Sequence, residues 1–165
     1  RDDTLAERVA EVLQRTGLPA ARLELEITES VMLDATEQTL VTLKQLKALG
    51  VQIAMDDFGT GYSSLSSLRS FPFDRIKIDR SFVKDLPASE DARAVVDLII
   101  QLGRLLNMKT TAEGVETEAQ LESLRSMSCT QVQGFLFDRP SPIKELQPEN
   151  QPHRPTFSNG ILKRA

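Results

Sequence analysis

The stretch VQIAMDDFGTGYSSL, residues 51–65, decides the fold because it joins a strand to a helix through an acidic turn that contains glycine. Val51–Met55 is a short, mostly apolar run, which predicts a strand. Asp56 follows it at once, and Asp57–Ser64 is a polar segment with two glycines, which predicts a loop. A short helix to Arg69 is expected next. The unit is therefore a strand that ends in two carboxylates and leads into a helix.

The same strand–helix unit recurs along the chain. Predicted strands begin near Leu23, Val51, Arg75, Lys109 and Thr130. Amphipathic helices are predicted over residues 4–16, 36–49, 90–106 and 116–127. Glu116 either caps the last of them, which we favour, or lines the mouth of a site. The alternation of strands and helices implies parallel strands joined by right-handed crossovers, which fits a doubly wound sheet or a TIM-like barrel. The lack of a Gly-x-Gly-x-x-Gly turn after a strand disfavours the dinucleotide-binding sheet.

Polar side chains at the ends of the predicted strands favour the barrel. They are Glu26 and Glu29, Asp56 and Asp57, Lys77 and Asp79, Glu113 and Glu116, and Gln133. In a barrel the carboxyl ends of the strands converge on one face, where active sites are built. A full barrel has eight units in about 250 residues. We therefore predict an α/β fold, a partial TIM-like (β/α) barrel of about five strand–helix units with its N-terminal strands missing.

Several carboxylates at one mouth repel one another unless a cation lies between them. Oxygen ligands suit Mg²⁺ or Mn²⁺, and two such ions can activate water against a phosphodiester. Lys77 lies between Ile76 and Ile78, so it points to the opposite face of its strand. It is either an interior lysine that holds a water or phosphate oxygen, or a surface lysine on an edge strand. A Schiff-base aldolase with Lys77 as nucleophile is a third hypothesis, which the acidic surroundings disfavour.

Composition limits the class of protein. The chain has 165 residues, a net charge of −4 and one cysteine, Cys129. It therefore cannot form an internal disulfide, and a cytoplasmic location is expected. The mild acidity argues against a nucleic-acid polymer as partner. The start, Arg1-Asp2-Asp3, is unlike a signal peptide, and we expect a longer parent protein in which another domain can provide a membrane anchor.

Five motifs resemble the EAL domain family in order and spacing. They are LELEITES (23–30), MDDFGTGYSSL (55–65), DRIKIDRSFV (74–83), AEGVET (112–117) and QGFLFDRP (133–140). The resemblance covers about residues 18–146. It implies a TIM-like barrel that hydrolyses cyclic di-GMP to linear pGpG with Mg²⁺ or Mn²⁺.

The resemblance also implies roles for individual residues. Metal ligands are implied at Glu26, Asp56, Asp57 and Glu113, with Asp56 or Asp57 bridging two ions. Lys77 positions the hydrolytic water, and Glu113 is the catalytic glutamate, as metal ligand or general base. Gln133 and Asp79 lie near the site. Glu29 braces a loop that links metal binding to dimerisation, and that loop contains Phe58, Gly59, Thr60 and Gly61.

Two features of the family are absent from this chain. It contains no Glu-Ala-Leu motif, and its asparagines, Asn107, Asn150 and Asn159, do not lie at strand ends. Activity is therefore expected only when upstream sequence completes the barrel; the alternative is a receptor that binds cyclic di-GMP without hydrolysing it. Residues 1–146 are assigned to the barrel and 147–165 to a flexible tail. Expected partners are cyclic di-GMP, a second copy in a homodimer, and sensory or cyclase domains upstream in cis.

Overall fold

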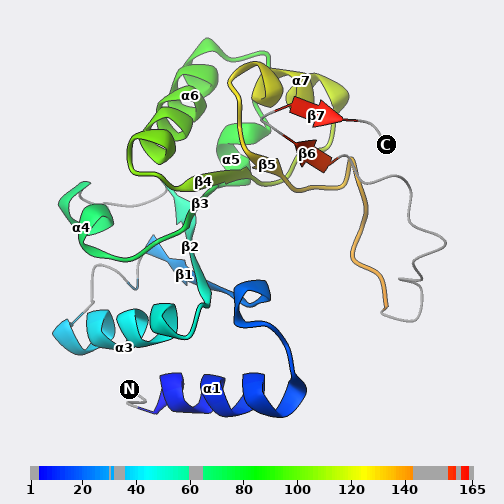
Figure 1. Ribbon diagram of the computed structural model, residues 1–165. Helices are drawn as coiled ribbons and strands as arrows, with labels where there is room; N and C mark the ends of the chain where they lie inside the picture. Colours follow the sequence, from blue (N-terminus) through cyan, green and yellow to red (C-terminus); the bar gives the residue numbers. More distant parts are fainter. Residues whose placement is uncertain are drawn as a thin grey trace. The chain divides into compact units, whose positions relative to one another are not determined.

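The computed structural model describes residues 4–29, 31, 36–59, 65–142, 156–158 and 161–163. The contacts within the chain divide it into two compact units. The first comprises Arg1–Lys77 with Leu106–Met108, and the second comprises Ile78–Leu105 with Lys109–Ala165. Figure 1 labels the helices and strands of both units.

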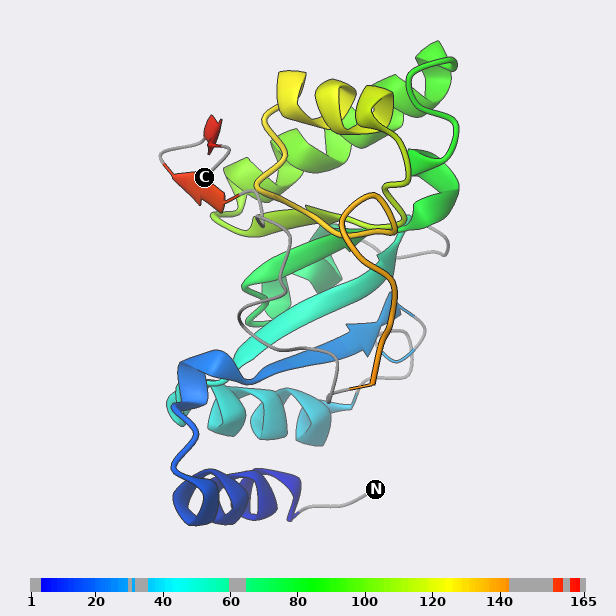
Figure 2. The same cartoon turned by 90° about the vertical axis from the view of Figure 1, so that its right-hand side faces the viewer.

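The first unit packs helices against parallel strands. Its elements are α1 (Leu5–Thr16), η1 (Ala20–Arg22), β1 (Glu24–Thr28), α3 (Glu37–Ala48), β2 (Gln52–Phe58), α4 (Leu65–Ser70) and β3 (Arg75–Ile78), whose last residue falls in the second unit. Strands β1 and β2 run parallel, in register from Glu24 opposite Gln52 to Thr28 opposite Asp56. Helix α3 lies between α1 and these strands in both views (Figures 1 and 2).

Local sequence signals explain where these elements begin and end. Helix α1 ends at Gly17, whose left-handed backbone (φ 69°) lets its N–H donate to the carbonyl of Leu13. Helix α3 begins with a capping box, in which Thr36 and Thr39 each bond the other's backbone N–H. Strand β2 supplies the core through three consecutive residues without solvent exposure, Ile53, Ala54 and Met55.

The second unit repeats the arrangement. Its elements are α5 (Arg80–Val83), α6 (Glu90–Leu105), β4 (Lys109–Ala112), α7 (Glu118–Ser126), β5 (Gln131–Val132), and the antiparallel pair β6 (Thr156–Ser158) and β7 (Ile161–Lys163). Helices α6 and α7 lie on the same side of β4 and β5 in both views (Figures 1 and 2). Strands β4 and β5 pair in parallel through two residue pairs only, Thr111 with Gln131 and Ala112 with Val132.

Side chains extend this short ladder by one step. The backbone N–H of Thr110 donates to the hydroxyl of Thr130 at 2.7 Å, and the N–H of Thr130 donates to the hydroxyl of Thr110 at 3.3 Å. The Cys129 thiol beside them is buried and donates to the carbonyl of Gln131. Strand β5 is therefore held by two hydroxyls as well as by its backbone.

The strands of the five-stranded sheet follow one another in chain order, β1-β2-β3-β4-β5. Helices lie between them in the sequence, which confirms the predicted α/β alternation. All five strands fall at or within one residue of their predicted starts. The two-stranded β6–β7 sheet in the region predicted as a flexible tail has no counterpart in the prediction.

Four predicted boundaries are wrong. Strand β2 continues through Asp57 and Phe58, which had been placed in the loop. The last strand is predicted over residues 130–135, but β5 stops at Val132 because the chain turns over 134–137. Helix α7 begins at Glu118 and is capped by Thr117, whereas Glu116 was expected to cap it. The third strand is predicted over residues 75–79, but β3 ends at Ile78 because Asp79 caps helix α5, which was not predicted.

Candidate active site

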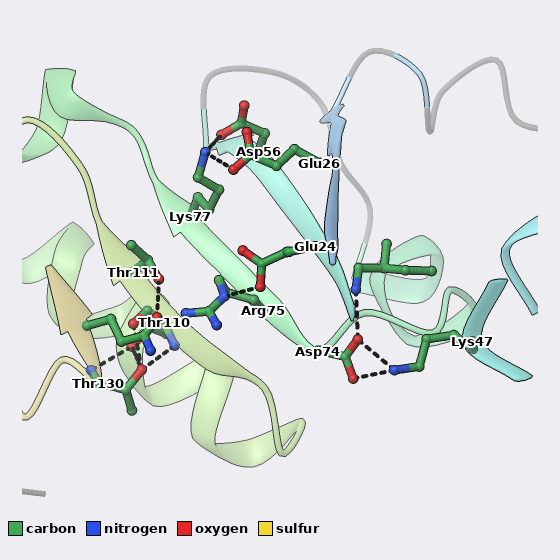
Figure 3. Close-up of polar contacts among 12 residues, drawn as sticks. Glu24, Glu26, Lys47, Asp56, Asp74, Arg75, Lys77, Thr110, Thr111 and Thr130 are labelled. Atoms are coloured by element: carbon green, nitrogen blue, oxygen red, sulfur yellow. Dashed lines mark hydrogen bonds and ion pairs between the residues drawn. The ribbon is translucent and has the colours of Figure 1, made fainter. Parts of the chain in front are cut away.

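Lys77 is the centre of a charged cluster in the first unit. It lies on β3 between two isoleucines that are fully buried, and its own exposure is only 6 %. Its Nζ is 2.7 Å from Oε1 of Glu26 on β1 and 3.0 Å from Oδ1 of Asp56 on β2. Figure 3 shows the three side chains converging from three strands. The alternative of a surface lysine is therefore wrong, because the ammonium is enclosed and neutralised by two carboxylates.

The two carboxylates of this cluster differ in exposure. Almost half of the Glu26 side chain, 48 %, is open to solvent, whereas only 20 % of the Asp56 side chain is. Asp56 Oδ1 is buried and has no aligned hydrogen bond among the described residues, so its contact with Lys77 is an ion pair only. A buried carboxylate oxygen in this state can serve as a ligand for a cation.

Asp57 ends the same strand with an unusual backbone. Its φ is 55°, in the left-handed region that aspartate tolerates better than most residues. The neighbouring Gly59 donates its N–H to Oε2 of Glu29 at 3.3 Å, and Glu29 is buried, with 4 % exposure. Glu29 therefore contacts the start of the segment that it was expected to brace. Phe58 is half-buried in β2, and Thr60 and Gly61 lie outside the described residues.

Asp79 has a structural partner of its own. Its Oδ1 accepts a hydrogen bond of 2.9 Å from the Ser81 N–H at the start of α5. Hydrogen bonding from the Ser81 side chain, aided by that backbone N–H, lowers the pKa of Asp79 below its ordinary value. Asp79 thus caps a helix, and a role toward a ligand stays a prediction.

Glu113 lies in the second unit, just after β4, where it is half-buried. Its N–H donates to the carbonyl of Ile78 at 3.1 Å. The residues around it are tied to the segment after β5, because Gln133 donates to the Ala112 carbonyl at 2.8 Å and Val115 donates to the Gln133 carbonyl at 3.0 Å. Backbone bonds therefore connect the segments that carry Glu113 and Gln133, although the Gln133 side chain itself is exposed.

Two sets of interactions were missed by the sequence reasoning. Arg75 Nε contacts Oε2 of Glu24 at 2.7 Å. Asp74 accepts from Lys47 Nζ at 2.6 and 2.7 Å and from the Ile53 N–H at 2.8 Å. The first pair had a signal in the sequence, because its members precede Glu26 and Lys77 by two residues and so share their strand faces. The second joins Lys47 of helix α3 to Asp74, which precedes β3, and no shared strand face indicated this pairing.

Comparison with known proteins identifies the family. Residues 1–140 match the model of the EAL domain. The chain belongs to the EAL domain family.

Relatives of known name and structure agree with this assignment. The chain is 48 % identical over 142 residues to the bifunctional diguanylate cyclase/cyclic di-GMP phosphodiesterase MucR of Pseudomonas aeruginosa, a match that covers 86 % of this chain and 21 % of MucR. The solved PaMucR phosphodiesterase complex with c-di-GMP superposes with a TM-score of 0.82 at 47 % identity, over 87 % of this chain and 58 % of that one. The manganese and c-di-GMP complex of Klebsiella pneumoniae BlrP1 at pH 9.0 superposes with a TM-score of 0.76 at 36 % identity, over 81 % of this chain and 34 % of the BlrP1 chain.

These matches also define the extent of the chain. It spans 17 to 21 % of the length of the first curated relatives and 58 % of the PaMucR chain. The fold is thus part of an EAL-type barrel, as predicted. None of the helices in the described ranges combines the length and apolarity that a bilayer crossing requires. The domain boundaries, the homodimer and the cytoplasmic location stay predictions.

Proposed function

We propose that the protein containing this chain hydrolyses cyclic di-GMP to linear pGpG, using Mg²⁺ or Mn²⁺, when upstream sequence completes the barrel. The observation that carries the proposal is the buried Lys77 between Glu26 and Asp56 at one end of neighbouring strands. Relatives named as cyclic di-GMP phosphodiesterases support the same substrate. The upstream part would supply the Glu-Ala-Leu glutamate and the asparagine that this chain lacks.

The residues of the first unit fit a hard divalent cation. Glu26, Asp56 and Asp57 offer only oxygen donors, and the buried Asp56 Oδ1 is free of aligned hydrogen bonds within the described part of the chain. We assign these three carboxylates as ligands of a two-metal site, and the resemblance to the family adds Glu113 as a ligand. Ions held there supply an activated water and stabilise the departing oxygen of the phosphodiester.

The chain's own side chains orient the reactants in this proposal. Lys77 donates hydrogen bonds from Nζ to the attacking water or to a phosphate oxygen, from a position that two carboxylates fix. Because Lys77 is buried, little water competes for its ammonium, which strengthens its attraction for a phosphate. Glu113 acts either as a ligand or as the base that accepts the proton of that water. Glu29 holds Gly59 and thereby the start of the loop beyond β2.

Turnover of cyclic di-GMP with Mn²⁺, followed by chromatography for pGpG, tests the proposal. The assay compares this chain, the full-length protein, and full-length Lys77→Met and Lys44→Met variants. Lys44 is exposed on α3 and controls for the loss of a lysine. We expect pGpG from the full-length protein only, with kcat roughly a hundredfold lower in Lys77→Met and unchanged in Lys44→Met. Tight binding of cyclic di-GMP without any pGpG would instead establish the receptor alternative.

A further inference from the structure

Two ion pairs lie one above the other in the first unit, and each joins β1 to β3. Arg75 Nε is 2.7 Å from Glu24, and Lys77 Nζ is 2.7 Å from Glu26. Because side chains alternate along a strand, the two glutamates share one face of β1 and the two cations share one face of β3. Figure 3 shows both pairs beside the same strands.

The Lys77–Glu26 pair crosses over β2 at a small residue, whereas Gln52 is the β2 residue in register with Glu24 of the other pair. The strand order places β2 between β1 and β3. Ala54 is the β2 residue in register with Glu26, and it is fully buried. A methyl group there leaves room for a long side chain to pass above β2, which a leucine or isoleucine would occupy.

The pair of Arg75 with Glu24 is sheltered from solvent. Only 13 % of the Arg75 side chain and 30 % of the Glu24 side chain are exposed, so the pair is less screened than a surface ion pair. Arginine presents fixed, planar donors, whereas lysine carries a mobile point charge on a flexible stem. Residues two apart on a strand are separated by roughly 6.6 Å. A Glu24 without its arginine would therefore be a third carboxylate within reach of Lys77, beside Glu26 and Asp56.

We propose that Arg75 is a positioning residue for Lys77. By engaging Glu24, it leaves the Lys77 ammonium to Glu26 and Asp56, the carboxylates beside which the proposed water and phosphate bind. This inference rests on the proposed function, which assigns Lys77 its part in hydrolysis.

The Arg75→Gln substitution in the full-length protein tests this role, because it removes the charge and retains a polar side chain of similar reach. With Lys77 drawn toward Glu24, kcat for cyclic di-GMP should fall about tenfold while KM changes less than about twofold. The dissociation constant of Mn²⁺, measured by calorimetry without nucleotide, should fall several-fold, since Glu26 and Asp56 lose their competing ammonium. Structural damage would weaken metal binding, so the opposite signs separate the two causes.

A double substitution and two single ones complete the test. Glu24→Gln/Arg75→Gln also removes the competing carboxylate, so kcat and the Mn²⁺ dissociation constant should both return toward the wild-type values. Arg75→Lys should retain most of the turnover. Arg125→Gln, which breaks the exposed pair with Glu122 on α7, serves as the control and should change neither quantity.

The inference is overturned if Arg75→Gln leaves kcat unchanged, if it weakens Mn²⁺ binding, or if the double variant is no better than the single one. Failure of the proposed function has a different signature, since the wild-type protein would then make no pGpG. In that case the Mn²⁺ titrations alone still decide whether Arg75 controls the charge around Glu26 and Asp56.

Discussion

Replacing Gly134 by alanine should destabilise the second unit and damage the segment that carries Glu113. A Cβ at this position would overlap the carbonyl oxygen and the nitrogen of Val115 and lie 2.7 Å from its carbonyl carbon. These are backbone atoms, so no side-chain rotation can relieve the overlap. The same atoms of Val115 bond to neighbouring residues, the N–H to the Gln133 carbonyl and the carbonyl to the Leu136 N–H, each at 3.0 Å.

The size of the effect follows from this geometry. Overpacking a close contact costs about 1–3 kcal/mol, and a rigid backbone neighbour places Gly134→Ala near the upper end. Each kcal/mol lowers Tm by about 2–4 °C in a domain of 150–250 residues, so we expect a decrease of about 6–12 °C. Gly17→Ala is the matched control, because no atom lies within 4 Å of its Cβ position. It carries only the strain of a positive φ, about 1 kcal/mol, or about 2–4 °C.

Thermal unfolding of the full-length protein, followed by near-ultraviolet circular dichroism, measures the difference, and pGpG formation on the same samples measures turnover. Gly134→Ala should reduce both Tm and turnover, whereas Gly17→Ala should reduce only Tm. Equal Tm values for the two glycine variants would refute the close approach of Gly134 to Val115. A large loss of stability with full turnover would refute the link to Glu113.

Three further predictions concern single side chains. Asp74→Ala removes the acceptor of Lys47 Nζ and of the Ile53 N–H, and it should lower the free energy of unfolding by about 2 kcal/mol in urea titrations; a change below about 0.5 kcal/mol would contradict this. Burial raises the pKa of the Cys129 thiol, so it should react with iodoacetamide at pH 8 only in denaturant, and rapid labelling of the native protein would show that the thiol is not enclosed. Hydrogen bonding lowers the pKa of Asp79 below 3.8; its stabilisation is therefore present above that pH and is lost as the pH falls through the lower value of the folded state. Melting curves from pH 6 to pH 2.5 should show the difference between wild type and Asp79→Ala shrinking only in the acid range, and a constant difference would argue against the capping bond.

The elements that the sequence predicted well are those with a local signal. The positions of strand β2 and helix α3 follow from an apolar run and from apolar residues at helical spacing, which are patterns within a few residues. The interior position of Lys77 follows from the alternation of Ile76, Lys77 and Ile78, and its exposure of 6 % agrees. These features depend on the periodicity of apolar residues, which can be recognised from residues that are close together in the sequence.

The features that escaped prediction depend on tertiary partners. Strand β5 is two residues long because the chain turns over 134–137, and the hydroxyls of Thr110 and Thr130 add bonds at its other end. No local sequence pattern predicts this pairing of hydroxyls. Thr117 caps α7 in place of Glu116 because Gln120, three residues further on, completes a capping box with it. The pair of Glu24 with Arg75 has a signal in the shared strand faces, but its partners follow only once the strand order is known. The pair of Asp74 with Lys47 has no such signal.

The mutual bonds of Thr110 and Thr130 also make these two positions dependent on each other during sequence change. Each hydroxyl serves the backbone of the other residue, so a valine at one site leaves an amide of the other without its acceptor. Loss of a single hydroxyl is therefore costly, whereas serine preserves the bond at either site. We expect variation at residues 110 and 130 to be correlated among proteins that share this short β5, with hydroxyl residues kept or lost together.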